Sequence, residues 1–291
     1  MIVKNRITID RAFREQLRRA RLDTVDDVLN CHGDSLAAWS RTSDTIRFEP
    51  GDGSSTLYIK RYHYPKWRHR VRAMFRGTFF KQSRARSEFR TLSLMRQLGI
   101  QAVRPVAYGE RRIGHFVRSC FLITEGVPDC MALSSFIKQF GEHRGSAKAI
   151  RLRREILSAL ARQIRHMHDA GFVHRELFWR NVLIRALPDD RFEFYFVDAS
   201  VGRRIRLAPR RHESIVGDLA ALGAVAPHFC SKADQLRFLL EYLDADTLSK
   251  DNRDWLRRVQ ARSDRLRPAE LERIRRGAFF DSPVSESLEL A

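Results

Sequence analysis

The feature that most constrains the fold is a change of character near residues 126–130. Before it, the short β-prone runs AAWSRT, TIRFE and TLYIKRY precede a helical segment at 83–99, and VRPVAYGERR and HFVRSCFLITEGV follow that segment. After it, apolar residues recur mostly at helical spacing, most clearly over 132–141 and 148–171. This order predicts an α+β, bilobal fold, with a small antiparallel sheet in the N-terminal lobe and a mainly helical C-terminal lobe.

The same pattern gives expected domain bounds along the 291 residues. We expect an N-terminal helical leader over 1–35, with helices at 9–21 and 24–29, and a sheet lobe over 36–127. The helical lobe should cover 128–280, and the tail 281–291 should be disordered. Each lobe is long enough to bury a core of its own.

The charge balance predicts an anionic partner. The chain has 54 Lys and Arg against 35 Asp and Glu, a formal net charge of +19. Nucleic acid, an anionic membrane leaflet, a phosphorylated glycolipid and an acidic protein all satisfy that demand, so charge does not choose among them. The most basic run is 61–90, which also carries aromatic residues, and a second basic run, RRIRLAPRR, occupies 203–211.

Cysteine usage and hydropathy favour a cytoplasmic protein. Four scattered cysteines show neither a disulfide framework nor a C-x-x-C spacing. The N-terminus has no apolar core of the secretory type, and no stretch approaches 18 apolar residues. We therefore expect a cytoplasmic protein that at most rests on a membrane surface.

The segment GFVHRELFWRN at 171–181 carries the most specific chemical signal. It has the His-x-acid-x-x-x-x-Asn spacing of a kinase catalytic loop, with glutamate where aspartate is usual. In that arrangement His174 braces the loop, the Glu176 carboxylate accepts the proton of a substrate hydroxyl, and Asn181 coordinates Mg²⁺.

Two aspartates follow the loop in the order that phosphoryl transfer requires. Asp198 ends the apolar run FYFVDAS and is the candidate second ligand of Mg²⁺, although Ala199 and Ser200 replace the usual Phe and Gly. Asp218 opens the apolar stretch GDLAAL and would brace the catalytic loop, or else is a simple acid at a helix N-terminus.

The first half of the chain supplies candidates for nucleotide binding. Lys60 ends the predicted strand TLYIKRY and would contact the α- and β-phosphates of ATP, while Glu88 in the following helix would pair with it. The backbone at Glu125 and Val127 fits a hinge that pairs with adenine. No G-x-G-x-x-G loop precedes Lys60, and RTSD at 41–44 is the only candidate to cover the phosphates.

Together these segments resemble the lipopolysaccharide core kinases of Gram-negative bacteria. The resemblance covers nearly the whole chain, and SRARSEFRTLSLMRQLGI followed by PVAYGE is its most characteristic part. It implies a protein kinase-like fold, ATP and Mg²⁺ as cofactors, and phosphorylation of a heptose or Kdo sugar of the inner core. It implies as partner an anionic glycolipid at the inner-membrane surface, and it gives the residues above the roles already described. The family also lacks an obvious Gly-rich loop.

The departure at Glu176 leaves alternatives open. Glutamate keeps the carboxylate but lengthens the side chain by roughly 1.5 Å, and a misplacement of about 1 Å can cost on the order of a hundredfold in rate. An active kinase is favoured over a weak pseudokinase or nucleotide-binding scaffold, because the lysine and both metal ligands are retained. A basic nucleic-acid-binding protein ranks third, so no nucleic acid is expected as partner. A phosphotransferase for a small hydroxylated molecule also remains open.

Overall fold

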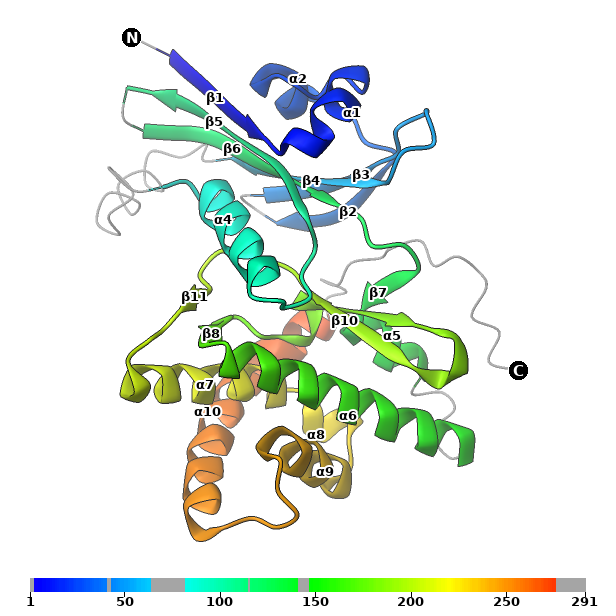
Figure 1. Cartoon of the computed structure of the whole chain (residues 1–291), viewed down its shortest axis with the longest axis vertical. Helices are drawn as coiled ribbons and strands as arrows, with labels where there is room; N and C mark the ends of the chain where they lie inside the picture. The colour runs from blue at the N-terminus through cyan, green and yellow to red at the C-terminus, as the bar shows by residue number, and fades with distance from the viewer. Residues whose placement is uncertain (1–2, 41–42, 64–81, 115, 141–146, 276–291) are drawn as a thin grey trace. The chain divides into compact units, whose positions relative to one another are not determined.

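The structure is a computed structural model that describes residues 3–40, 43–63, 82–114, 116–140 and 147–275. The chain divides into two compact units (Figure 1). One, the sheet unit, comprises residues 1–94 and 103–128; the other, the helical unit, comprises 95–102 and 129–291.

The sheet unit is built on one six-stranded sheet in which every neighbouring pair of strands is antiparallel. Its strands, in sheet order, are β1 (Val3–Ile9), β5 (Pro105–Ile113), β6 (Phe116–Glu125), β4 (Leu57–His63), β3 (Ser43–Phe48) and β2 (Ser35–Ser40). Its helical segments are η1 (Arg11–Phe13), α1 (Arg14–Arg19), α2 (Val25–Asn30) and most of α4 (Arg84–Gln97). Strand β4 lies between β3 and β6, so Lys60 pairs with Thr45 on one side and Leu122 on the other.

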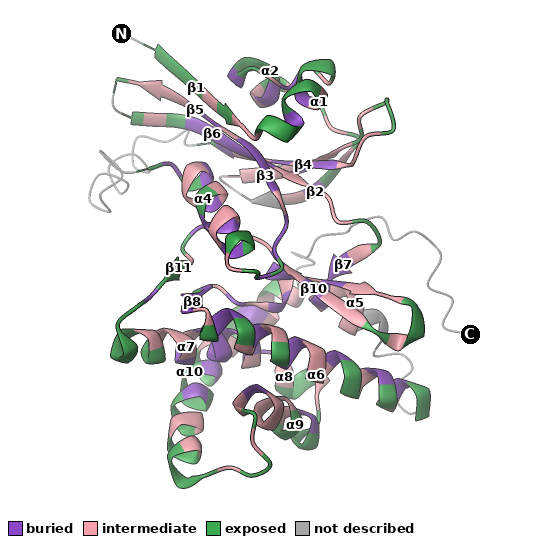
Figure 2. Cartoon of the chain, viewed as in Figure 1, coloured by how far each residue is buried: buried purple, intermediate pink, exposed green. Residues whose placement is uncertain are grey.

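A compact apolar core joins the N-terminal helices to this sheet (Figure 2). Leu17 of α1 and Val28 of α2 are fully buried, in one cluster with Ile59 of β4 and Phe121 of β6. Burial of apolar surface contributes roughly 25 cal/mol per Å², so this cluster stabilises the packing of the two helices on the sheet. The segment 3–30 is therefore part of the sheet unit.

The sequence analysis placed only helices in the N-terminal leader, and this is wrong for residues 3–9. They form β1, which pairs with β5 in a register that sets Ile7 opposite Gly109. The alternation in ITI at the end of this segment explains the strand, because Ile7 and Ile9 pack against the core cluster and Thr8 between them is exposed.

The helical unit contains longer helices and two small sheets. Its elements are β7 (Cys130–Ala132), α5 (Leu133–Phe140), α6 (Ala147–Asp169), β8 (Phe172–Val173), η3 (Trp179–Asn181), β9 (Val182–Ala186), η4 (Pro188–Asp190), β10 (Phe192–Phe196), β11 (Arg203–Arg204), α7 (Ala208–Gly223), α8 (Ala226–Phe229), α9 (Lys232–Leu243) and α10 (Lys250–Arg275). Strands β10, β9 and β7 form one sheet, and β11 and β8 form the other.

Helix α6 organises this unit. Its buried residues recur every three or four positions and include Leu152, Ile156, Leu160 and Ile164, so one face is apolar along its length (Figure 2). Helix α9 packs along α6, and α10 packs along α7. Gly171 follows α6 with φ +76°, a left-handed conformation that glycine adopts without strain, and turns the chain into β8.

The expected position of Asp218 at a helix start is also wrong. Helix α7 begins at Ala208, with Pro209 in its first turn, so Asp218 lies well inside the helix. Proline is favoured there because its missing N–H would be unpaired at a helix N-terminus in any case.

Two predicted features lie outside the described residues: the tail 281–291 and most of the first basic run, 64–81. None of the four cysteines is in a disulfide. In the part of the chain that the structure describes, no helix is both long and apolar enough to cross a membrane.

Candidate functional site

Asp218 holds the backbone of the segment that contains His174 and Glu176. Its Oδ2 accepts a hydrogen bond from the His174 N–H at 2.7 Å, and its Oδ1 accepts one from the Arg175 N–H at 2.5 Å. The Asp218 side chain is fully buried, and its Oδ2 lies 3.3 Å from Nε2 of the buried His168. Nδ1 of His168 lies 2.8 Å from the Tyr242 hydroxyl. One carboxylate therefore ties together α6, α7 and residues 171–181, which are called the catalytic segment below after their predicted role.

The imidazole of His174 links this segment to the residue before Asp198. The ring is fully buried, and Nε2 lies 3.0 Å from the Val197 carbonyl oxygen, to which it donates. Burial lowers the pKa of His174 below its ordinary 6.5, against the opposing effects of Asp218, the Val197 hydrogen bond, Asp198 and Glu176. The ring is therefore a neutral structural brace.

Asn181 is oriented by two hydrogen bonds. Its Nδ2 donates to the Glu176 carbonyl at 2.8 Å, and its own carbonyl accepts from the Val197 N–H at 3.0 Å. Because the amide nitrogen is engaged, the side chain presents Oδ1 as an acceptor. Within the described residues no group donates to that oxygen.

The oxygen atoms of Asn181 and Asp198 fit the chemistry of Mg²⁺. An amide oxygen and a carboxylate are ligands that this cation prefers, and kinases complete its coordination with phosphate oxygens and water. Asp198 itself has a left-handed backbone with φ +54°. Asn181 and Asp198 are the candidate ligands because they offer oxygen atoms of the kind that Mg²⁺ prefers. Among the described residues no cluster of three or more His, Cys, Asp and Glu would hold a metal ion.

The Glu176 carboxylate is not committed to a structural partner. Its backbone carbonyl accepts from the Phe178 N–H at 2.8 Å as well as from Asn181, which fixes the main chain at this point. In the described part of the chain no hydrogen bond or ion pair engages its side chain, which is half-buried. A carboxylate on a fixed backbone and without a partner is able to accept a proton.

Arg180 was missed by the sequence analysis. It lies beside Asn181, its guanidinium pairs with the buried Glu270 of α10, and it stacks at 4.1 Å over the Phe178 ring. Burial lowers the pKa of Arg180, whereas Glu270 and Asp198 raise it. No local signal links residues 180 and 270, so only the fold reveals this pair.

Lys60 and Glu88 form the predicted ion pair in the sheet unit. Lys60 Nζ lies 3.4 Å from Glu88 Oε2, and Glu88 is 2% exposed. The Tyr62 hydroxyl donates to the same Oε2 at 2.8 Å. Tyr62 was not predicted, although its position two residues after Lys60 places both side chains on one face of β4.

The structure gives less support to the predicted adenine-binding hinge at Glu125 and Val127 and to the predicted phosphate-covering loop at 41–44. The Glu125 N–H donates to the Arg104 carbonyl at 2.9 Å, so only the Glu125 carbonyl would be open to adenine. Val127 follows the end of β6. Residues 41 and 42 of the RTSD loop lie outside the described residues. The prediction of a loop is wrong for Ser43 and Asp44, which begin β3, and Asp44 accepts a hydrogen bond from Arg61 Nε at 2.8 Å.

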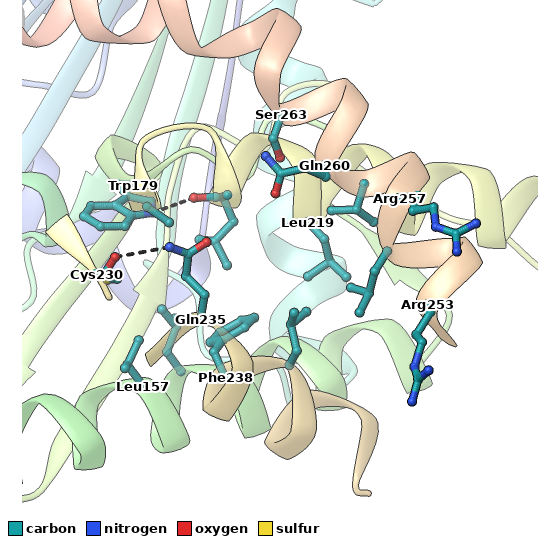
Figure 3. Close-up of a pocket in the computed structure, with 17 residues that line it drawn as sticks. Leu157, Trp179, Leu219, Cys230, Gln235, Phe238, Arg253, Arg257, Gln260 and Ser263 are labelled. Carbon is teal, nitrogen blue, oxygen red and sulfur yellow. Dashed lines mark hydrogen bonds between the residues drawn. The ribbon is translucent and has the colours of Figure 1, made fainter. Parts of the chain in front are cut away.

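An apolar cavity of about 440 Å³ lies among the helices of the helical unit (Figure 3). Trp179 of η3 is part of its lining, and its Nε1 donates to the Leu222 carbonyl at 2.7 Å. Arg253 and Arg257 of α10 also line it. This cavity was not predicted from the sequence, because six separate helical segments (α6, η3, α7, α8, α9 and α10) contribute its walls.

Comparison with known proteins identifies relatives over much of the chain. Residues 40–242 match the model of the lipopolysaccharide kinase (Kdo/WaaP) family. Lipopolysaccharide core heptose(I) kinase WaaP of Pseudomonas aeruginosa is 28% identical over 162 residues, 54% of this chain and 59% of that protein. A 3-deoxy-D-manno-octulosonic acid kinase of Vibrio cholerae is 27% identical over 121 residues, 42% of this chain and 45% of that protein. The chain spans about half the length of the curated relatives it matches.

A solved structure confirms the predicted kinase-like α+β fold. It is described as WaaP in complex with acyl carrier protein, and it matches with a TM-score of 0.64 at 22% identity. The match covers 90% of this chain and 99% of that one.

Proposed function

The chain belongs to the lipopolysaccharide kinase (Kdo/WaaP) family, and from this premise we propose that it transfers the γ-phosphate of ATP to a sugar hydroxyl of the lipopolysaccharide inner core. The acceptor sugar is heptose or Kdo. One observation carries the proposal: Asp218, His174 and Asn181 fix the backbone on which the uncommitted Glu176 carboxylate stands.

Each residue has a role that follows from its contacts. Glu176 accepts the proton of the acceptor hydroxyl as the new P–O bond forms and the bond to ADP breaks. Asn181 and Asp198 hold Mg²⁺, which when bound neutralises charge on phosphate oxygens. Lys60, oriented by Glu88, contacts the α- and β-phosphates. Glu125 and Val127 offer backbone groups to adenine.

The direct test is incubation with γ-labelled ATP and deacylated core oligosaccharide. Two acceptors that end in heptose or in Kdo separate the two sugars. We expect label in one of them and none after Asp198→Asn, which removes the charge of a metal ligand while keeping the volume. Intact ATP binding without transfer to either acceptor would instead favour the nucleotide-binding scaffold.

The longer side chain of Glu176 gives a second experiment. If glutamate is a compromised base, Glu176→Asp raises the rate; if the site is built around glutamate, the same change lowers it by an amount on the order of a hundredfold. Because the Glu176 side chain has no hydrogen bond or ion pair among the described residues, we expect little change in stability. The control Glu155→Asp makes the same change at an exposed acid of α6, outside the catalytic segment.

The net charge of +19 supports an anionic acceptor and action at the cytoplasmic face of the inner membrane.

The same net charge also suits an acidic protein partner, and the structural neighbour was solved in complex with acyl carrier protein. Size-exclusion chromatography with purified acyl carrier protein tests this: co-elution lost at high salt supports it. Salt-sensitive binding to random DNA that is indifferent to ATP would support the nucleic-acid alternative.

A further inference from the structure

We propose that residues 201–211, here called the basic ridge, dock the protein on the phosphate headgroups of an anionic phospholipid leaflet. The sequence of the ridge is VGRRIRLAPRR. The inference deepens the proposed function, on which it rests for the membrane-borne acceptor.

The arginines of the ridge lack the acidic partners that several other surface arginines of this unit have, among them Arg151, Arg162 and Arg258. Within the described residues none of the five guanidinium groups, those of Arg203, Arg204, Arg206, Arg210 and Arg211, is in an ion pair or a hydrogen bond. The nearest acid in sequence, Glu213, already pairs with Arg258 and Arg262. Five like charges in nine residues repel one another, so an external anion is the favourable neighbour.

The ridge also exposes large apolar side chains between its charges. Leu207 is 60% exposed and Val201 is 39% exposed. Arginine with interleaved aliphatic residues suits the interface of an anionic membrane, where guanidinium groups meet phosphates and aliphatic groups enter the acyl boundary. The ridge has no aromatic residue on which nucleic-acid bases would stack. Its chemistry therefore favours a lipid surface over nucleic acid.

Backbone pairing fixes the ridge beside the catalytic segment. Arg203 pairs with Val173, the residue before His174, and the Ile205 N–H donates to the Gly171 carbonyl at 2.8 Å. Ile205 is buried, whereas its neighbours on both sides are exposed. Arg203 and Arg204 are thus held at exposed positions by the same strand pair that leads into the catalytic segment, and Arg206 follows at an exposed position. Docking there would bring a membrane surface close to that segment.

The test is co-sedimentation with vesicles of phosphatidylcholine alone or with added phosphatidylglycerol. We expect salt-sensitive binding that requires phosphatidylglycerol. Each arginine near an anionic leaflet contributes roughly fivefold in binding, so the triple variant Arg203→Gln, Arg204→Gln, Arg206→Gln should bind on the order of a hundredfold more weakly.

A matched control removes the same net charge elsewhere in the helical unit. The triple variant Arg151→Gln, Arg257→Gln, Arg275→Gln changes exposed arginines that each have an acidic partner. It should bind nearly as wild type does. Equal loss in both triple variants, or no loss in the ridge variant, overturns the proposal. Because all variants share residues 64–81, the basic charge of that run does not affect the comparison.

Two further variants separate a lipid surface from other anion sites. Replacement of the same three arginines by lysine should keep binding within about twofold, because a leaflet attracts either cation. If the triple lysine variant binds vesicles as weakly as the triple glutamine variant, the arginines form a bidentate phosphate site, and the proposal is overturned. Leu207→Ser should weaken binding at unchanged charge, and unchanged binding would contradict the apolar contact.

These measurements need neither ATP nor acceptor. Failure of vesicle binding leaves the phosphotransfer result untouched, and absent phosphotransfer leaves the vesicle result standing. Thermal unfolding of each variant verifies that the ridge substitutions, all at exposed positions, leave the fold intact.

Discussion

Asp218→Asn tests whether one buried carboxylate organises the catalytic segment. The substitution keeps the volume but replaces one acceptor oxygen by an NH₂ group. The remaining oxygen can accept from His174 N–H or from Arg175 N–H, whereas the other N–H then faces a donor. Loss of a hydrogen bond to a charged group costs about 1.5–3 kcal/mol, and the buried N–H left unpaired adds about 1–3 kcal/mol.

We therefore expect a loss of about 2.5–6 kcal/mol in the free energy of unfolding. In a chain of this size that corresponds to a melting temperature lower by roughly 5–24 °C. Circular dichroism during thermal unfolding measures the shift. Phosphotransfer should fall by an amount on the order of a hundredfold as well, since the base is no longer held in place.

Asp244→Asn is the matched control. This carboxylate is 81% exposed and pairs with Arg165 at 3.0 Å, and its left-handed φ of +55° suits asparagine. The change should alter stability by less than about 1 kcal/mol. If Asp218→Asn unfolds within that same margin of wild type, Asp218 does not organise the segment.

Three further predictions concern single contacts. Tyr62→Phe removes the 2.8 Å hydrogen bond to the buried Glu88 and should cost about 1–2 kcal/mol in urea unfolding; an unchanged midpoint would show that the bond contributes nothing. Gly109→Ala would place Cβ 2.3 Å from the Phe121 ring and should cost about 1–3 kcal/mol, whereas the control Gly51→Ala meets nothing within 4 Å and should be tolerated. Burial lowers the pKa of His174 below 6.5, so the unfolded ring binds a proton that the folded ring does not. Its contribution to stability is therefore present above pH 6.5 and declines as the pH falls, and urea midpoints of His174→Gln between neutral and mildly acidic pH should decline less steeply than those of wild type.

The sequence predicted the kinase-like α+β fold because local patterns of period 2 and 3.6 appear in the right order. It missed β1, whose seven residues include only three apolar ones and pair with a strand about a hundred positions away. It also misplaced the start of α7, since the polar stretch before Asp218 hides a helix that proline begins. These errors arise in segments whose local propensity is weak, because tertiary contacts determine their secondary structure.

In the candidate site, too, local patterns predicted some residues, whereas contacts between distant segments were not predicted. The pair Lys60 and Glu88 was predicted from kinase order, and the structure contains it. The partners that hold the site in place were not predictable: Tyr242 reaches His168 across 74 positions and Glu270 reaches Arg180 across 90. Such contacts depend on how helices pack, and no local spacing encodes them.

We propose that Glu176, Asn181 and Asp198 serve phosphoryl transfer to an inner-core sugar. Label transfer from γ-labelled ATP to deacylated core oligosaccharide, by the wild type and by Asp198→Asn, tests this proposal. We expect a phosphorylated sugar with wild type and none with Asp198→Asn, with both proteins folded. Equal transfer by the two proteins, or none by wild type on either heptose or Kdo acceptors, would contradict it.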